Sequence, residues 1–239
     1  MEIFIIALLT ILASGIGTIT GFGTSTILIP ILLFYLPLPE TLLVVGVIHF
    51  SGDIWKMILF RKGFDWKLIL TFGLTGIIAS FLGARIVFSA SPEVLLRILG
   101  AFMLSYVIFL VFKPDFKVPK KNLTAITGGG LSGFFAGIFG VGGAIRTLFL
   151  STFDLQKAVF VATTGAIAFL IDSTRITTYL VNGVRLEDAY LWGFLTFIPA
   201  SFAGTALAKK VVDKIPQKWF RIVVALFLFI MGIKFLIFP

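Results

Sequence analysis

Eight stretches of the chain contain almost no charged residues, and short polar segments separate them. The stretches cover roughly residues 2–36, 41–60, 68–90, 93–112, 123–153, 156–181, 187–208 and 217–238. A helix that crosses a bilayer needs about 20 mostly apolar residues, so six of the stretches have the length of one crossing. The other two, at 2–36 and 123–153, are longer than one ordinary crossing. The pattern predicts membrane-spanning helices and a break in the chain within each long stretch.

The composition agrees with a membrane location. Of the 239 residues, 59% are hydrophobic and 13% are charged, whereas a soluble domain has about 45–50% apolar and about 25% charged residues. The alternating apolar and polar segments of an outer-membrane barrel are absent. Only Glu2 precedes the first apolar segment, where a signal peptide would have positive charge. We therefore expect an all-α, polytopic integral protein of the cell membrane, with the lipid bilayer as its surroundings.

The net charge of +9 reflects the orientation of the protein in the membrane and does not indicate nucleic-acid binding. Lysine and arginine cluster in short loops, as the positive-inside rule predicts for cytoplasmic loops. Absence of cysteine excludes disulfides and thiolate ligands, and a single histidine argues against a metal site, so we expect no cofactor. The loop clusters are Arg61, Lys62 and Lys67; Lys113, Lys117, Lys120 and Lys121; and Lys209, Lys210, Lys214 and Lys218.

The sequence contains an internal repeat at an offset of about 119 to 124 residues. The aligned pairs include rare charged residues in apolar surroundings, which makes chance a poor explanation. They predict a first transmembrane repeat at 1–112, a basic linker at 113–122 and a second repeat at 123–239. The matches are Gly21-Phe-Gly23 with Gly140-Val-Gly142, Asp53-x-x-Lys56 with Asp172-x-x-Arg175, Ala79-Ser-Phe-Leu-Gly83 with Ala200-Ser-Phe-Ala-Gly204, and Pro92-x-x-x-x-Arg97 with Pro216-x-x-x-x-Arg221.

Loop charge also distinguishes parallel from inverted repeats. If both long stretches cross the membrane once, loop Lys and Arg divide eight against five between the two faces. If the chain instead turns back at 21–23 and at 140–143, twelve of them share one face and only Arg185 is opposite. The second arrangement obeys the positive-inside rule far better. We therefore expect two inverted repeats, each with a glycine-broken first helix, and both termini outside the cell.

The two glycine breaks are the first candidates for a binding site. Backbone interrupted at membrane depth must be buried in protein or line a watery cavity. A short helix follows each break, and its N-terminus offers free N–H groups and partial positive charge to an anion. Packing of helices through small residues is the structural alternative for such glycines. The candidate substrate-binding residues are Gly21, Gly23, Thr24 and Ser25 in the first repeat and Gly140, Gly142 and Gly143 in the second.

Arg146 strengthens the prediction of an anion site. It follows Gly143 by three residues and lies far from either end of its apolar stretch. A buried arginine in such a place must find an anion or carbonyl oxygens. A permanent salt bridge to Asp53 or Asp172 is the other interpretation.

Two acidic residues stand in otherwise apolar helices, each with a cation three residues later. Asp53 precedes Lys56, and Asp172 precedes Arg175, so each pair shares a helix face and an intrahelical ion pair is one interpretation. His49 lies four residues before Asp53 on the same face. A proton relay or counter-ion role in coupling is therefore the other interpretation.

Enzymatic chemistry has no support in these motifs. His49-x-Ser51-x-Asp53 contains the residue types of a hydrolase triad, but helical residues two apart point about 200° from each other. The glycine clusters lack the Gly-Lys-Ser/Thr ending of a phosphate-binding loop. We expect no catalytic residues and no bound metal.

These features resemble the sulfite exporter TauE/SafE family, also called 4-toluene sulfonate uptake permeases. The resemblance covers essentially the whole chain and depends on Gly21-Phe-Gly23-Thr24-Ser25, on Gly137-Ile-Phe-Gly140-Val-Gly142-Gly143-Ala144, and on the Ala-Ser-Phe-x-Gly helix of each half. Members typically have more glycines where Thr24 and Ser25 stand here. The resemblance implies a multi-pass permease for small sulfur-containing anions such as sulfite, sulfonates, sulfoacetate or thiosulfate.

The sequence thus predicts a secondary transporter whose partners are a small anion and the lipid bilayer. A proton as coupling partner and a homo-oligomer are further hypotheses. Alternating access would move one repeat against the other. A passive anion channel that uses the same site is the alternative function.

Overall fold

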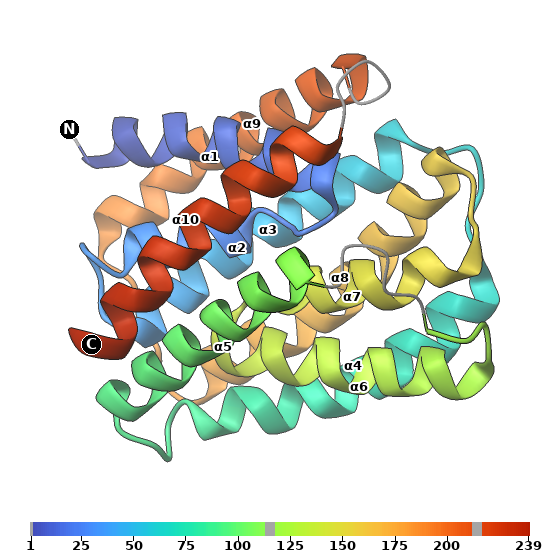
Figure 1. The fold of residues 1–239 in the computed structure, drawn as a ribbon. Coiled ribbons are helices and arrows are strands. Elements are labelled where there is room, and N and C mark those ends of the chain that lie inside the picture. Colours follow the sequence, from blue (N-terminus) through green and yellow to red (C-terminus); the bar gives the residue numbers. More distant parts are fainter. Residues whose placement is uncertain (1, 113–117, 212–216) are drawn as a thin grey trace.

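The computed structural model describes residues 2–112, 118–211 and 217–239, with 217–221 described by their backbone only. Over these residues the chain forms helices and no strand (Figure 1). The helices are α1 (Glu2–Thr20), α2 (Ser25–Leu32), α3 (Leu38–Leu59), α4 (Trp66–Ile86), α5 (Pro92–Phe112), α6 (Asn122–Phe139), α7 (Gly142–Leu150), the 3-10 turn η1 (Ser151–Phe153), α8 (Lys157–Val181), α9 (Asp188–Val211) and α10 (Gln217–Ile237).

The all-α membrane architecture predicted from the sequence is confirmed. Six of the described helices are long and apolar enough to cross a membrane. Their outer faces expose large apolar side chains, as in α4, where Leu70, Leu74 and Ile78 recur every fourth residue and are 58%, 59% and 63% exposed. In water such a stripe would be unfavourable, whereas lipid solvates it.

Both long apolar stretches are broken at the predicted glycines. Gly21, Gly23 and Gly140 have φ values of 77°, 83° and 68°, a left-handed conformation that glycine adopts without steric cost. Each break ends a long helix and starts a short one.

The chain turns back on itself after the second break. The Ser132 hydroxyl of α6 donates to the Gly142 carbonyl at 2.9 Å, and Gly128, one turn earlier in α6, lies against Phe149 near the end of α7. Helices α6 and α7 therefore run side by side in opposite directions.

The first break produces a similar reversal toward the other end of the molecule. Phe34, just after α2, lies with its ring centroid 5.1 Å from Lys234 Nζ near the C-terminus. At the start of α1, the Tyr190 hydroxyl donates to the Glu2 carboxylate at 3.5 Å. Helix α2 thus returns toward the end of the molecule where both termini lie (Figure 1).

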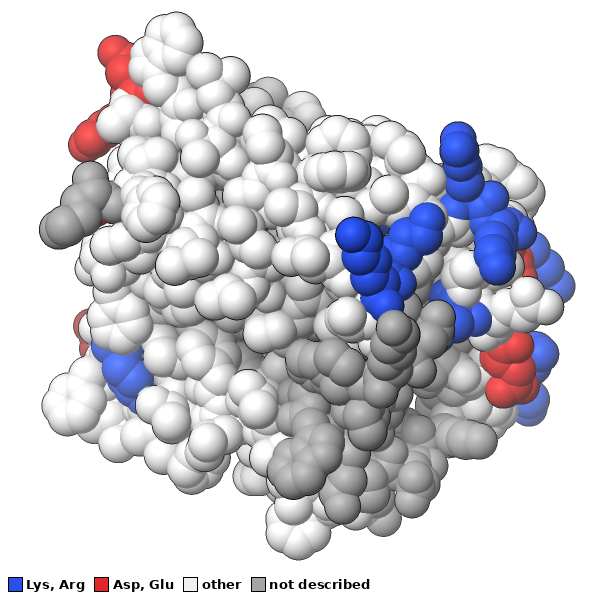
Figure 2. All heavy atoms as spheres, turned by 90° about the horizontal axis from the view of Figure 1, so that it is seen from above, with Lys and Arg blue, Asp and Glu red and all other residues white. Residues whose placement is uncertain are grey.

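Lysine and arginine gather at the opposite end. Most of those visible in Figure 2 lie away from the termini, and Arg61, Lys62, Lys157 and Lys209 line one pocket there. This separation agrees with the charge pattern used in the topology prediction. The inverted relation of the repeats and the outside position of the termini stay predictions. Lys113, Lys117, Lys214 and the first half of the predicted linker, residues 113–117, lie outside the described residues.

The two sequence halves interleave in space. Gly83 of α4 packs against the Phe134 carbonyl of α6, and Gly204 of α9 packs against the Ile11 carbonyl of α1. Each contact joins the Ala-Ser-Phe-x-Gly helix of one half to the broken helix of the other. The helices can approach this closely because glycine has no side chain that would collide with the neighbouring backbone.

The serines of the same motif connect to the other half as well. Ser80 of α4 donates to the Ile171 carbonyl of α8 at 3.2 Å, and Ser201 of α9 is hydrogen-bonded to Ser51 of α3 at 3.0 Å. We call α1, α2, α3 and α9 the first bundle and α4, α6, α7 and α8 the second bundle, and the two bundles meet extensively along α3 and α8.

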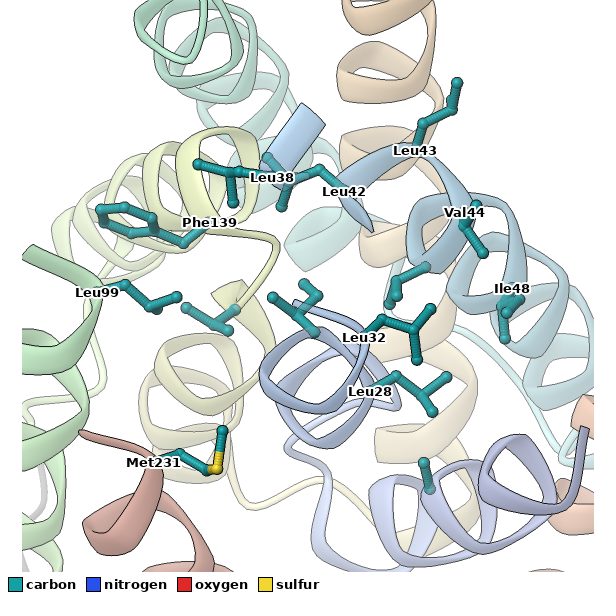
Figure 3. Close-up of a cluster of buried hydrophobic side chains, with 14 of the residues drawn as sticks. Leu28, Leu32, Leu38, Leu42, Leu43, Val44, Ile48, Leu99, Phe139 and Met231 are labelled. Carbon is teal, nitrogen blue, oxygen red and sulfur yellow. The ribbon is translucent and has the colours of Figure 1, made fainter. Parts of the chain in front are cut away.

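The short helices occupy the middle of the structure. Leu28 and Leu32 of α2 are fully buried. Figure 3 shows them among Ile48 of α3, Phe139 of α6 and Met231 of α10. Close packing of this kind holds the ends of the short helices at fixed positions.

Candidate functional site

The two glycine breaks contact each other. A Cβ atom at Gly143 would collide with the Phe22 carbonyl oxygen, and one at Gly21 would lie 2.6 Å from the hydroxyl oxygen of Thr147. That hydroxyl donates to the Gly21 carbonyl. Gly143 is required because backbone lies too close for any side chain, and Gly21 is favoured because its backbone is left-handed, with φ 77°.

Neither short helix has a side-chain cap at its N-terminus. The N-cap residues, Thr24 for α2 and Val141 for α7, make no capping hydrogen bond. The Thr24 hydroxyl donates instead to Ser14 Oγ at 3.3 Å. Ser25 Oγ is buried and has no hydrogen-bond partner among the described residues. The first N–H groups of both short helices therefore lack a side-chain cap, and helix N-termini of this kind favour an anion.

A buried network of charged side chains lies beside the breaks, between α3 and α8. His49 Nδ1 is 2.7 Å from Asp172 Oδ2 and 3.8 Å from Asp53 Oδ2. The sequence placed His49 and Asp53 on one face of α3. The hydrogen bond to Asp172 joins the two halves of the chain, and only the tertiary structure reveals it.

Each acidic residue also pairs with the cation on its own helix. Lys56 Nζ donates to Asp53 Oδ1 at 2.8 Å, and Arg175 Nε donates to Asp172 Oδ1 at 2.6 Å. The four side chains are buried, so solvent screens these pairs little.

The network touches both breaks. A Cβ atom at Gly23 would lie 2.7 Å from His49 Nε2, and one at Gly140 would lie 3.2 Å from Arg175 Nη1. His49 Nε2 has no hydrogen-bond partner among the described residues. The imidazole therefore connects Asp172 on one side with the first glycine break on the other.

Arg146 lies in α7 and is buried, with 3% of its surface exposed. Asp53 and Asp172 attract its guanidinium and Arg175 repels it, but both carboxylates are paired elsewhere, and the described residues contain no ion pair with Arg146. Its Nε has no hydrogen-bond partner among them. The permanent salt bridge considered from the sequence is thus not formed in this structure.

A bound cation does not suit this network. His49, Asp53 and Asp172 offer ligand atoms within 4.8 Å of one another. Lys56 and Arg175 already neutralise the two carboxylates, and Arg146 adds positive charge nearby. The local field therefore favours an anion over a metal ion.

Most of the residues singled out in the sequence meet in this region. The Thr24 hydroxyl donates to Ser14 Oγ, and Gly142 lies against the Ser132 carbonyl, so the role of both residues in binding stays a prediction. Sequence reasoning missed Thr147 and Tyr179, whose hydroxyl donates to the Gly137 carbonyl. Tyr179 stands four residues after Arg175 on the same helix face, a spacing that could have identified it.

Known proteins share this sequence pattern. The sequence model of the sulfite exporter TauE/SafE family matches residues 6–235. A probable membrane transporter protein of Methanocaldococcus jannaschii is 26% identical over 247 aligned positions, which cover 93% of this chain and 91% of the relative. The chain therefore belongs to the sulfite exporter TauE/SafE family of membrane transporters and is a multi-pass membrane protein.

Proposed function

We propose that this protein is a secondary transporter that moves small sulfur-containing oxyanions, such as sulfite, sulfonates, sulfoacetate or thiosulfate, and that it has no enzymatic activity. Family membership supports the choice of sulfur oxyanions. The single observation that supports an anionic substrate is the buried Arg146, which has no carboxylate partner among the described residues.

Charge balance within the site explains why Arg146 points to an anion. Lys56 cancels Asp53 and Arg175 cancels Asp172, so one positive charge remains in a region of low dielectric constant. An isolated buried charge is costly, and a bound anion would offset the cost. The substrate would thus complete the charge balance of the site.

The uncapped helix ends supply further donors to the same anion. The starts of α2 and α7 lie next to the contact between the two breaks, where Gly143 packs against the Phe22 carbonyl. Ser25 Oγ is a further candidate donor. Helix N-termini bind oxyanions through backbone N–H groups, so the substrate would lie between the breaks, held by Arg146 and by N–H groups of both repeats.

His49 is the candidate proton carrier. Its Nδ1 contacts Asp172, and its Nε2 faces Gly23 at the edge of the proposed anion site. A proton on the imidazole would add positive charge next to the anion, so each would favour binding of the other. Asp53 on α3, Arg175 on α8, Lys56 and Arg146 are the other charged groups of this network.

The interleaved packing suggests which parts move. The sequence suggested motion of one repeat against the other, but the helices of each repeat pack mainly on the other repeat. We therefore propose that alternating access moves the first bundle against the second. The His49–Asp172 contact and both glycine breaks lie between these bundles.

Charge movement in proteoliposomes tests the proposal. Wild type and Arg146→Ala would be challenged with sulfite, thiosulfate, sulfoacetate, taurine, sulfate and acetate on a supported membrane. A hydrogen bond to a charged group contributes about 1.5–3 kcal/mol, so we expect the apparent Kd of the variant to rise about 10- to 100-fold. Arg97→Ala, at an exposed position, is the control.

Two outcomes would redirect the proposal. Unchanged anion affinity in folded Arg146→Ala protein would show that the site is elsewhere. Conductance beyond carrier turnover, without counterflow of labelled anion, would favour the passive anion channel.

A further inference from the structure

A cavity of about 400 Å³ connects the first glycine break with the basic end of the molecule. It lies between the end of α1 and the connection from α7 to α8. Thr18 and Gly21 form part of its wall at the break, and Asp154 and Lys157 form part of its wall in the connection. The cavity therefore extends from Gly21, at the first glycine break, toward the end where lysine and arginine gather.

Thr18 gives this cavity a polar inner wall. Its side chain is buried, with 3% of its surface exposed, and its hydroxyl has no hydrogen-bond partner among the described residues. In contrast, the hydroxyls of Thr10 and Thr20 on the same helix donate to carbonyl oxygens one turn earlier, as is usual for threonine in a helix. An unpartnered buried hydroxyl beside a cavity points to a polar guest.

A second pocket adjoins the basic end of this cavity. It has a volume of about 310 Å³ and shares Lys157 with the cavity. Arg61, Lys62 and Lys209 are its other charged lining residues, and no carboxylate lines it. These cations come from the ends of α3 and α9 and the start of α8, so three separate segments place positive charge around one hollow.

The positive-inside rule accounts for basic residues in these loops. It does not require them to surround one pocket that adjoins a cavity leading to the glycine break. Concentrated charge of one sign in a concave surface attracts counter-ions and raises their rate of arrival by about 10- to 1000-fold.

We propose that this cavity is the route by which a small anion passes between the basic end and the transport site, and that Arg61, Lys62, Lys157 and Lys209 form an outer anion-recruiting pocket at its mouth. The proposal deepens the proposed function and depends on its premise that the substrate is an anion. Thr18 would be a polar contact along the route.

Cysteine labelling tests the route without measuring transport. The chain contains no cysteine, so Thr18→Cys introduces a single thiol. Its reaction rates with an anionic methanethiosulfonate carrying a sulfonate and with a cationic one carrying a trimethylammonium group would be compared in membranes open on both faces. Thr177→Cys is the matched control, since it lines a hollow to which lysine and arginine do not contribute.

We expect the ratio of the anionic to the cationic reaction rate to be higher at Thr18→Cys than at Thr177→Cys. Changing Arg61, Lys62 and Lys209 to Gln should lower the ratio of anionic to cationic rates by about tenfold. Equal ratios with and without these cations would overturn the recruiting pocket. A Thr18→Cys thiol that reacts with neither reagent in folded protein would overturn the route.

Ser151→Cys, on the same cavity, provides a second thiol if Thr18→Cys does not fold. Labelling requires access and not turnover. If Thr18→Cys does not react while Arg146→Ala loses anion binding, the route is wrong and the proposed function stands. If Thr18→Cys reacts preferentially with the anionic reagent while Arg146→Ala binds the anion normally, the route stands and the proposed site is wrong.

Discussion

His49 Nδ1 lies 2.7 Å from Asp172 Oδ2, although 123 positions separate these residues in the chain. Through this contact, the ion pair of α3 and the ion pair of α8 become one buried network between the two bundles. The network also touches the glycine breaks through His49 Nε2 and Arg175 Nη1. A change at any one of these positions should therefore affect both stability and the anion site.

The close contact between the breaks predicts a strong effect of Gly143→Ala. A methyl group there would collide with the Phe22 carbonyl oxygen, which is backbone and has little room to move. We expect loss of transport and a lower midpoint of thermal unfolding in detergent. Gly130→Ala, in α6 with nothing within 4 Å of the added methyl group, should be neutral. Equal behaviour of the two variants would contradict the observed contact.

Breaking a buried ion pair should cost more than removing it entirely. Asp53→Asn leaves Lys56 buried without its carboxylate, and loss of one partner of such a pair costs about 3–5 kcal/mol. The double variant Asp53→Asn with Lys56→Met removes both charges and should recover most of the free energy of unfolding. Denaturation of both variants in the same detergent measures the difference. A double variant as unstable as the single one would show that the pair is not what stabilises this region.

Arg146→Met separates anion binding from folding. Removal of an unpaired buried charge should leave the protein as stable as wild type or more stable without substrate. A bound anion at 100 times its Kd stabilises the folded wild type by about 2.7 kcal/mol. We expect substrate to raise the Tm of wild type and not that of the variant, as measured by thermal shift. The same rise in both proteins would place the anion elsewhere.

His49→Gln tests the proposed proton coupling. Glutamine can still form a hydrogen bond with Asp172, but it cannot bind a proton near neutral pH. We expect an imposed pH gradient to drive no accumulation of anion by this variant above the level of protein-free liposomes, whereas exchange of labelled anion across the membrane persists. Normal pH-driven accumulation by His49→Gln would exclude His49 as the proton carrier.

Cross-linking can identify the moving parts, because the chain contains no cysteine. Phe50 and Phe169 stack with ring centroids 4.6 Å apart between the bundles, and Trp55 and Phe202 meet at 5.2 Å within the first bundle. A short thiol cross-linker between cysteines at 50 and 169 should stop transport, and one between 55 and 202 should permit it. Loss of transport with both cross-links would favour motion of the sequence repeats as units, because each pair joins residues of different repeats.

Hydrophobic patterning anticipated most of the helices. The stretches predicted at 41–60, 93–112 and 156–181 correspond to α3 (Leu38–Leu59), α5 (Pro92–Phe112) and α8 (Lys157–Val181). Both long stretches break at glycines that the sequence had singled out. These features depend on local requirements, since lipid demands apolar side chains and left-handed backbone favours glycine.

The membrane class, the family and the positions of the breaks could be predicted from the sequence, and the pairing of each acidic residue with the cation on its own helix was one of two interpretations that it allowed. Each of these depends on residues close together in the chain or on a recognisable repeat. Packing of the folded chain shows that the halves interleave, that His49 contacts Asp172, and that Arg146 has no carboxylate partner among the described residues. Such contacts join residues far apart in the chain, as Ser80 with Ile171 and His49 with Asp172, and they depend on how helices pack, which neither periodicity nor charge pattern encodes.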